Sequence, residues 1–245
     1  MSGPAATQAI VLAAGEGRRL RPLTLTTPKP LVPFFGRPLL DWAIDAVVRA
    51  GARRIAVNAW HLADAVAAHV ATLARARPEL ELFVAREPSL LGTGGAVRNL
   101  AGWLRPEPFW VMNSDAVIAE PVASLTRAPS LLVTRAPRYR RERRLVADPD
   151  GRWRALVEGG HDDALTFCGL TLADPELPSR LPDGASCILR QGYLPFLDRL
   201  DVRLVETRTF FADTGTPRAL VEAHVDGLEW VAARPGPPLV GAATS

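Results

Sequence analysis

The stretch AIVLAAGEGRRLRPLTLTTPKPLVPFFGRP, residues 9–38, decides how the chain folds. It begins with the apolar run AIVL, which is typical of a buried strand. Gly15, Gly17 and three arginines come next, and five prolines up to Pro38 exclude a continuous helix. Glycines let backbone N–H groups approach anionic oxygens closely, and arginines bind such oxygens with two hydrogen bonds. The stretch therefore predicts a strand that runs into a phosphate-binding loop.

Lys29 lies in this loop and is the only lysine among the 29 lysines and arginines of the chain. A lysine ammonium is a compact point charge, whereas a guanidinium is a planar fork. One lysine among arginines therefore indicates that the position requires a compact charge. A solvated loop lysine would leave the same pattern, so this second interpretation stays open.

The composition is that of an ordinary globular protein. The 245 residues suffice for one large α/β domain or two small ones, and 48% of them are hydrophobic. A net charge of +3 is too small to indicate nucleic-acid binding. Cys168 and Cys187 make neither a metal cluster nor a disulfide framework, so we expect a reducing, cytoplasmic setting. We expect no signal peptide, and no apolar run reaches the roughly 20 residues of a membrane span.

The first half of the chain alternates between strand and helix patterns. We predict strands at 8–13, 54–59, 80–86 and 108–113, with helices at 39–50, 62–77 and 96–104. Such alternation implies βαβ units and a parallel sheet, in which ligands bind at the carboxyl ends of the strands. The first loop, a second glycine-rich segment at 88–95 and Asp115 all follow predicted strands. They should therefore meet at one edge of the sheet.

The second half is richer in strands. We predict strands at 130–134, 165–172, 202–206 and 209–212, a hairpin that turns at 148–151, and helices at 187–200 and from Pro217 to about 233. Thr216 is expected to cap the last helix, with Pro217 at its first position. We expect a single domain over residues 1–233, consisting of the parallel sheet and a smaller β-rich lobe, and a disordered tail at 234–245.

The first loop does not match two common phosphate-binding motifs. It lacks the GxxxxGK[ST] spacing of a P-loop, and Leu20 stands where the dinucleotide-binding fingerprint has its third glycine. By itself, the glycine pair would also fit a purely structural turn.

Two blocks of the loop, LAAGEGRRLRPLT (12–24) and PKPLVP (28–33), together resemble the signature of the sugar-1-phosphate nucleotidyltransferases. Four further segments resemble that family's motifs in order: LGTGGAV (91–97), VMNSD (111–115), TFCGL (166–170) and FADTGTP (211–217). The resemblance covers residues 9 to about 225. It is to the short form without a C-terminal β-helix, as in muramate-phosphate uridylyltransferases and small mannose-1-phosphate guanylyltransferases.

The resemblance implies a Rossmann-like, mostly parallel sheet flanked by helices, in which the β-rich lobe binds sugar. It also implies an enzyme that transfers a nucleotidyl group from a nucleoside triphosphate to a sugar 1-phosphate and needs Mg²⁺. Arg19 would hold the leaving pyrophosphate, and Lys29 would lie between the reacting phosphates. Asp115 and Asp213 would be the Mg²⁺ ligands; taken alone, each could also be a turn residue or a helix cap.

Further site residues follow from the same resemblance. Nucleotide-binding residues would be Leu12, Ala13, Ala14, Gly15, Gly17, Thr93, Gly94 and Gly95. Sugar-binding residues would be Asn113, Glu158 and Gly169, although Gly169 would also fit a β-bulge. Gly160 stands where the family has a lysine, two positions after Glu158, and Arg154 or Arg190 are candidates to replace its charge.

Two alternatives remain open from the sequence: a catalytically inactive nucleotide-sugar sensor on the same fold, and a cytidylyltransferase for phosphocholine-type acceptors. We expect a monomer or dimer that binds neither nucleic acid nor membrane. The basic run at 135–144 is accordingly expected to be a solvated loop.

Overall fold

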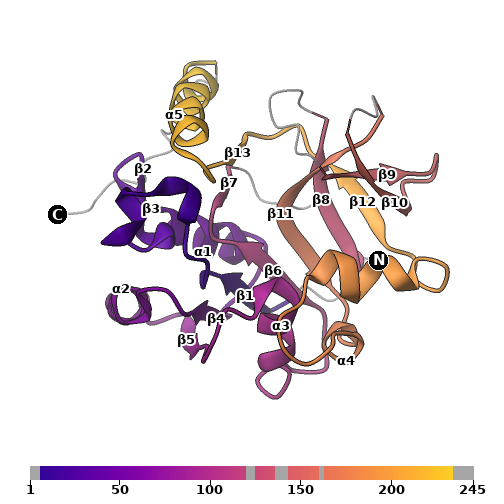
Figure 1. Cartoon of the computed structure of the whole chain (residues 1–245), viewed down its shortest axis with the longest axis horizontal. Helices are drawn as coiled ribbons and strands as arrows, with labels where there is room; N and C mark the ends of the chain where they lie inside the picture. The colour runs from indigo at the N-terminus through magenta and orange to yellow at the C-terminus, as the bar shows by residue number, and fades with distance from the viewer. Residues whose placement is uncertain (1–5, 120–124, 136–142, 160–162, 234–245) are drawn as a thin grey trace.

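The computed structural model describes residues 6–119, 125–135, 143–159 and 163–233 (Figure 1). Its centre is a seven-stranded sheet in the order β12-β8-β11-β6-β1-β4-β5. Neighbouring strands are parallel except for β11, which is antiparallel to both β6 and β8. The strands are β1 (Gln8–Leu12), β4 (Arg54–Ala59), β5 (Glu81–Arg86), β6 (Phe109–Asn113), β8 (Ser130–Thr134), β11 (Thr166–Ala173) and β12 (Arg203–Glu206). The expected mostly parallel α/β sheet is thus confirmed.

Strand β1 lies inside the sheet and is buried on both faces. Val11 packs into an apolar core with α1 and α2, whereas Ile10 packs into a second core with α3 and α4. Helices therefore cover both faces of the sheet, as Figure 1 shows. The helices are α1 (Leu39–Arg49), α2 (Ala63–Ala76), α3 (Gly92–Asn99), α4 (Leu177–Arg180) and α5 (Pro217–Ala232).

Two predicted helices differ from the structure. Helix α3 begins at Gly92, so the three glycines of the second glycine-rich segment lie in its first turn, and only residues 88–91 precede it. The helix predicted for 187–200 is a π-helix at Ile188–Tyr193 followed by a 3₁₀ turn at Leu194–Phe196. Pro195 has no N–H group to donate, so a regular helix cannot continue through it.

Of a small pair of strands, the first was missed from the sequence and the second was predicted at 209–212. Strand β7 (Ala116–Ile118) pairs antiparallel with β13 (Phe211–Asp213), and their register sets Ala116 opposite Asp213. The hairpin β2 (Pro33–Phe34) and β3 (Arg37–Pro38) was also missed, because both strands are only two residues long. The β7–β13 pair joins residues about 100 positions apart and brings Asp213 beside the turn that holds Asp115.

The predicted hairpin forms as β9 (Arg143–Ala147) and β10 (Trp153–Glu158). In its turn, the Asp148 carboxylate accepts backbone hydrogen bonds from Asp150 (3.0 Å) and Arg152 (2.9 Å). The Arg154 guanidinium donates two bonds to the same carboxylate, at 2.9 and 2.6 Å. Arg154 is thus held at the turn, at the opposite end of β10 from Glu158.

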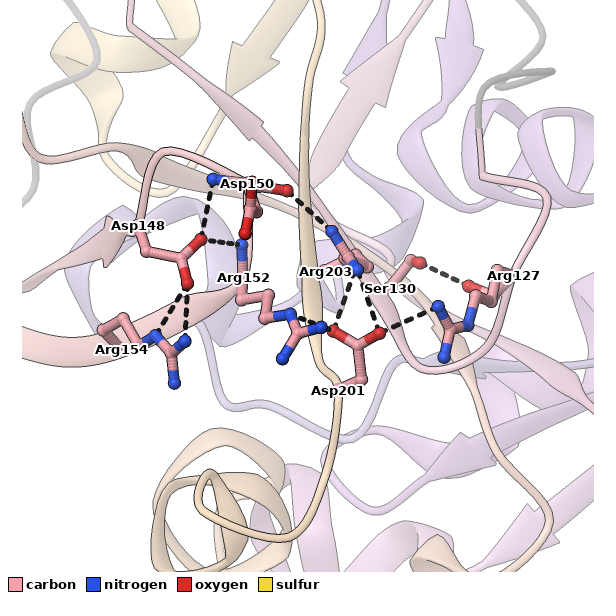
Figure 2. Close-up of polar contacts among 8 residues, drawn as sticks. All are labelled: Arg127, Ser130, Asp148, Asp150, Arg152, Arg154, Asp201 and Arg203. Atoms are coloured by element: carbon pink, nitrogen blue, oxygen red, sulfur yellow. Dashed lines mark hydrogen bonds and ion pairs between the residues drawn. The ribbon is translucent and has the colours of Figure 1, made fainter.

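Asp201 fastens this turn to the start of β12 (Figure 2). Its carboxylate forms ion pairs with three arginines. The nitrogen–oxygen distances are 2.8 Å to Arg127, 3.1 Å to Arg152 and 2.9 Å to Arg203. Arg203 also donates to the backbone oxygen of Asp150 at 2.6 Å. Burial raises the pKa of Asp201, but the hydrogen bond from Arg203 and the charges of Arg127 and Arg152 outweigh it and hold that pKa below its ordinary value.

Part of the basic run is buried, contrary to the expectation of a solvated loop. Arg144 lies in β9, is 4% exposed and donates to the backbone oxygen of Ala164. Residues 136–142, Gly160 and the tail at 234–245 lie outside the described residues. Within the described part, no helix is long and apolar enough to cross a bilayer.

We predict that Asp201→Asn lowers the free energy of unfolding by about 1–2 kcal/mol at neutral pH, because three guanidinium groups lose their shared carboxylate. The loss is measured by denaturant unfolding. A carboxyl with a lowered pKa stabilises the fold above its ordinary pKa of about 3.9, and this contribution is lost as pH falls through the lowered value. The two proteins should therefore converge in stability at low pH.

Asp183→Asn is the matched control, since Asp183 is 92% exposed and pairs with Arg98 at 3.2 Å across the surface. It should change stability by less than about 0.5 kcal/mol. Equal losses in both variants, or a loss in Asp201→Asn that does not depend on pH, would contradict the fastening role.

Candidate active site

A cavity of about 340 Å³ opens at the carboxyl ends of β1, β4 and β6. This is the edge of the sheet where the sequence predicted that both glycine-rich segments and Asp115 would meet. The lining residues are Leu12, Ala14, Gly15, Gly17, Arg18, Arg19, Lys29, Pro30, Asn58, Leu90, Gly92, Thr93, Asn113, Ser114, Asp115 and Gly215.

The two glycines of the first loop have different structural roles. Gly17 has φ +63°, and a Cβ there would lie 2.9 Å from Thr24 Cγ2 and 3.0 Å from Lys29 Cβ. The Thr24 hydroxyl donates to the Gly17 oxygen at 2.9 Å, so the loop closes tightly on itself. A Cβ at Gly15 would meet nothing within 4 Å. Gly17 is therefore required by the turn, whereas Gly15 leaves space at the cavity.

Lys29 points at Asp115 inside the cavity. Its Nζ lies 2.5 Å from Asp115 Oδ2, and the two side chains are only 11% and 25% exposed. The only lysine of the chain is thus a partly buried charge in the cavity, and the interpretation as a solvated loop residue is wrong.

Arg19 and Asp213 lie beside the same pair. The backbone N–H and hydroxyl of Thr214 donate to the Asp115 backbone oxygen at 3.1 and 2.9 Å. Asp213 Oδ1 accepts from the Gly215 N–H at 3.0 Å. A Cβ at Gly215 would lie 2.8 Å from Arg19 Nη2 and 3.0 Å from Asp213 Oδ1. The structure therefore gathers both predicted cationic residues and both predicted metal ligands.

The remaining loop arginines are held by Glu16. Arg18 donates to its carboxylate at 2.6 and 2.8 Å, and Arg21 lies 3.3 Å from it. The hydrogen bond from Arg18 lowers the pKa of Glu16. Arg18 and Arg21 thus differ from Arg19, which lies at the Gly215 turn next to Asp213.

The carboxylates of Asp115 and Asp213 are oxygen donors of the kind that Mg²⁺ binds together with a substrate. Among the described residues, no cluster of three or more His, Cys, Asp and Glu side chains could hold a metal. Two carboxylates alone leave most positions of an octahedral Mg²⁺ ion to water and phosphate oxygens, which is the arrangement that Mg²⁺ favours. The carboxylates therefore suit a cation that arrives together with a phosphorylated ligand.

The second glycine-rich segment packs against residues 184–188. A Cβ at Gly94 would lie 2.5 Å from Ser186 Oγ, and a Cβ at Gly95 would collide with the Gly184 oxygen. The Gly94 N–H donates to the Ser186 oxygen at 2.9 Å, and Thr93 Oγ1 accepts from the Ile188 N–H at 3.0 Å. Gly94 and Gly95 thus allow close packing, while Gly92 and Thr93 line the cavity.

Of the three predicted sugar-binding residues, two lie together. Asn113 lines the cavity, and a Cβ at Gly169 would lie 3.2 Å from its side chain. Gly169 has φ +83° and sits in an irregularity of β11 between Phe167 and Thr171, so it is also a bulge glycine. Glu158 is an exposed residue at the end of β10 and is not among the lining residues.

Two polar residues of the site were missed from the sequence. Asn58 lines the cavity and is 3% exposed, and Glu87 behind it is 7% exposed. Ala13, predicted to bind nucleotide, donates its backbone N–H to Asn58 Oδ1 at 2.6 Å and does not line the cavity. A signal for Asn58 was present, because it is a polar residue near the carboxyl end of the apolar strand RIAVNA.

We predict that Gly94→Ala lowers the free energy of unfolding by about 1–3 kcal/mol, because the new methyl group overlaps Ser186 Oγ and Leu181 Cδ2. Alanine is normally the better helix former, so intrinsic propensity opposes this loss. Thermal unfolding measures the difference.

Gly15→Ala is the control, since its Cβ meets nothing within 4 Å. It should change stability by less than about 0.5 kcal/mol. A stable Gly94→Ala protein, or an equally destabilised Gly15→Ala protein, would refute these separate roles.

Comparisons with known proteins agree with the geometry. The sequence profile of the family described as nucleotidyl transferase matches residues 8–130. The N-acetylmuramate alpha-1-phosphate uridylyltransferase of Neisseria meningitidis is 32% identical over 237 residues, which cover 91% of this chain and 99% of that protein. The mannose-1-phosphate guanylyltransferase catalytic subunit beta of Drosophila pseudoobscura is 27% identical and is matched over 86% of this chain and 60% of its own length. The chain therefore spans about 60% of that longer relative.

Solved structures share the fold. The inositol-1-phosphate CTP transferase of T. maritima superposes with a TM-score of 0.77 at 16% identity, over 91% of this chain and 96% of that one. HddC of Yersinia pseudotuberculosis, in complex with GMP-PN, gives 0.71 at 23% identity, over 90% of this chain and 99% of that one.

Proposed function

Because the chain belongs to the nucleotidyl transferase family, we propose that it transfers a nucleotidyl group from a nucleoside triphosphate to a sugar 1-phosphate and releases pyrophosphate. The observation that carries the proposal is the pairing of Lys29 with Asp115 at 2.5 Å, in one cavity with Arg19 and beside Asp213. We expect the reaction to run in the cytoplasm, by a monomer or a dimer.

The triphosphate lies along the first loop in this proposal. Gly15 leaves space for phosphate oxygens, and the cavity there is bounded by Arg18, Arg19 and Lys29. The base lies toward Gly92 and Thr93, where Leu12 and Leu90 provide apolar surface. A ligand of this length thus touches both glycine-rich segments at once.

The chemical step needs charge to be held in place and needs no covalent intermediate with the protein. An oxygen of the sugar phosphate attacks the α-phosphorus, the bond from that phosphorus to the bridging oxygen breaks, and its electron pair leaves with pyrophosphate. The Lys29 ammonium stabilises the charge on the reacting phosphoryl group, and Arg19 holds the leaving pyrophosphate. Lys29 is oriented for this role by its contact with Asp115 before any ligand binds.

Asp115 and Asp213 would hold Mg²⁺, which neutralises phosphate oxygens when it is bound. Backbone and hydroxyl groups of residues 214 and 215 hold both aspartates in place. Thr214 fixes the Asp115 backbone with two hydrogen bonds, and the Gly215 N–H fixes Asp213 Oδ1. On the acceptor side, Asn113 and Gly169 would contact the sugar phosphate, with Glu158 reaching a sugar hydroxyl.

We predict that Lys29→Ala, Asp115→Asn and Asp213→Asn each slow pyrophosphate release by about 100- to 1,000-fold, which corresponds to about 2.7–4 kcal/mol of transition-state stabilisation. Pyrophosphate is measured with Mg²⁺ and two substrate pairs: UTP with N-acetylmuramate 1-phosphate, and GTP with mannose 1-phosphate. Asp64→Asn is the control, because Asp64 is 93% exposed on α2, and it should keep the wild-type rate.

Undiminished rates in the variants would refute the assigned roles. A wild-type protein that binds nucleotide but releases no pyrophosphate with any sugar phosphate would instead favour a sensor. Turnover of CTP with phosphocholine alone would favour a different acceptor class.

A further inference from the structure

We infer that Asn58 is a positioning residue that ties the first glycine loop to the start of α3 and so sets the separation of the two walls that face the ligand. Asn58 lies near the carboxyl end of β4, and β4 lies between β1 and β5 in the sheet. The inference rests on the proposed function only for the identity of the ligand. It concerns a residue to which neither the sequence motifs nor the chemical step gives a role.

Three hydrogen bonds form a continuous connection between the two glycine-rich segments. Asn58 Oδ1 accepts from the Ala13 N–H at 2.6 Å, and Asn58 Nδ2 donates to Glu87 Oε1 at 2.8 Å. Glu87 Oε2 accepts from the Leu91 N–H at 3.2 Å. Ala13 follows β1, and Leu91 is the residue before α3, so the connection runs from one wall of the cavity to the other.

The connection lies next to the residues that face the ligand. Ala14 and Gly15 follow Ala13, and Gly92 and Thr93 follow Leu91, and all four line the cavity. A change in either hydrogen-bonded N–H would therefore move a lining segment. Since the proposed triphosphate touches both segments, its affinity depends on their separation.

Burying the polar side chains of Asn58 and Glu87 costs desolvation free energy. Glu87 is 7% exposed, and burial raises its pKa, although hydrogen bonds from Asn58 and Leu91 work against this. A buried carboxylate held by neutral donors gains less than it loses on leaving water, and an apolar pair of the same volume would cost less. What the polar pair adds is direction, because each oxygen bonds only to a donor and each N–H bonds only to an acceptor.

The amide at position 58 and the carboxylate at position 87 can be exchanged with little change in side-chain shape. In Asn58→Asp, a carboxylate faces the Glu87 carboxylate. In Glu87→Gln, one carbonyl oxygen remains for two donors, the Asn58 amide and the Leu91 N–H. In the double variant, the new carboxylate at position 58 would accept from both Ala13 and the new amide at position 87, whose own oxygen would accept from Leu91. Every donor is then matched again, with the negative charge moved from position 87 to position 58.

The test compares the wild type with both single variants and the double variant. Each single variant should bind a non-hydrolysable nucleoside triphosphate with Mg²⁺ about tenfold more weakly and raise KM for the triphosphate by a similar factor. Since Asn58 is not assigned to the chemical step, kcat should change by less than about threefold. The double variant should return to within about threefold of the wild type in both affinity and KM. Asp183→Asn serves as the control and should match the wild type.

Hydrogen exchange separates this inference from the proposed function. Amide exchange at residues 13–15 and 91–94 should be faster in each single variant and return toward the wild-type rate in the double variant, with or without nucleotide. This readout remains valid if the wild type shows no turnover. If Asn58→Asp does not fold, Glu87→Gln against the double variant makes the same comparison.

Additive losses in the double variant, or single variants with wild-type exchange and affinity, would overturn the inference. Loss of kcat alone, with unchanged triphosphate affinity and exchange, would also overturn it, because that pattern belongs to a residue that contacts the reacting atoms.

Discussion

The burial of β1 on both faces is the constraint on which the rest of the structure depends. Its residues alternate between two apolar cores, so the strand has no polar face and must lie inside a sheet covered by helices. A parallel strand in that position ends at an edge where its neighbours end too. The first loop leaves the sheet at this edge, between the ends of β4 and β6. The charged side chains that line the cavity lie around the point where the loop leaves the sheet.

Tight contacts within the site explain why it needs small residues. Gly17 allows the loop to close on Thr24 and Lys29, Gly94 allows α3 to pack on Ser186, and Gly215 leaves room for Arg19. Glycine is thus required at these positions by protein–protein packing as much as by access for a ligand. Gly15 differs, because a side chain there would meet no protein atom. A glycine-rich motif can therefore mix residues that contact ligand with residues that only permit the fold.

The charges of the site are held by partners that come from distant parts of the chain. Lys29 from the first loop contacts Asp115, whose backbone oxygen accepts a hydrogen bond from Thr214. The pairing of β7 with β13 holds Asp213 beside Asp115. The hairpin β9–β10 is fastened separately, through Asp201 and its three arginines. The β9–β10 hairpin and the residues around the cavity are thus held by separate sets of contacts.

The sequence by itself determined the mostly parallel sheet, the order of most elements along the chain, the first loop and the residue types at the cavity edge. These features follow from strand periodicity, glycine spacing and the binding of ligands at the carboxyl ends of strands, which are local or topological properties. It did not reveal β7, or that β7 pairs with the strand predicted at 209–212, because these strands are three residues each and pair across about 100 positions. Nor did it show that Gly94 and Gly95 pack against residues 184–188, or that Asn58 and Glu87 connect the two loops. Those facts depend on which segments touch. Only the tertiary structure decides such contacts, because burial and hydrogen bonding bring together segments that are far apart and share no sequence motif.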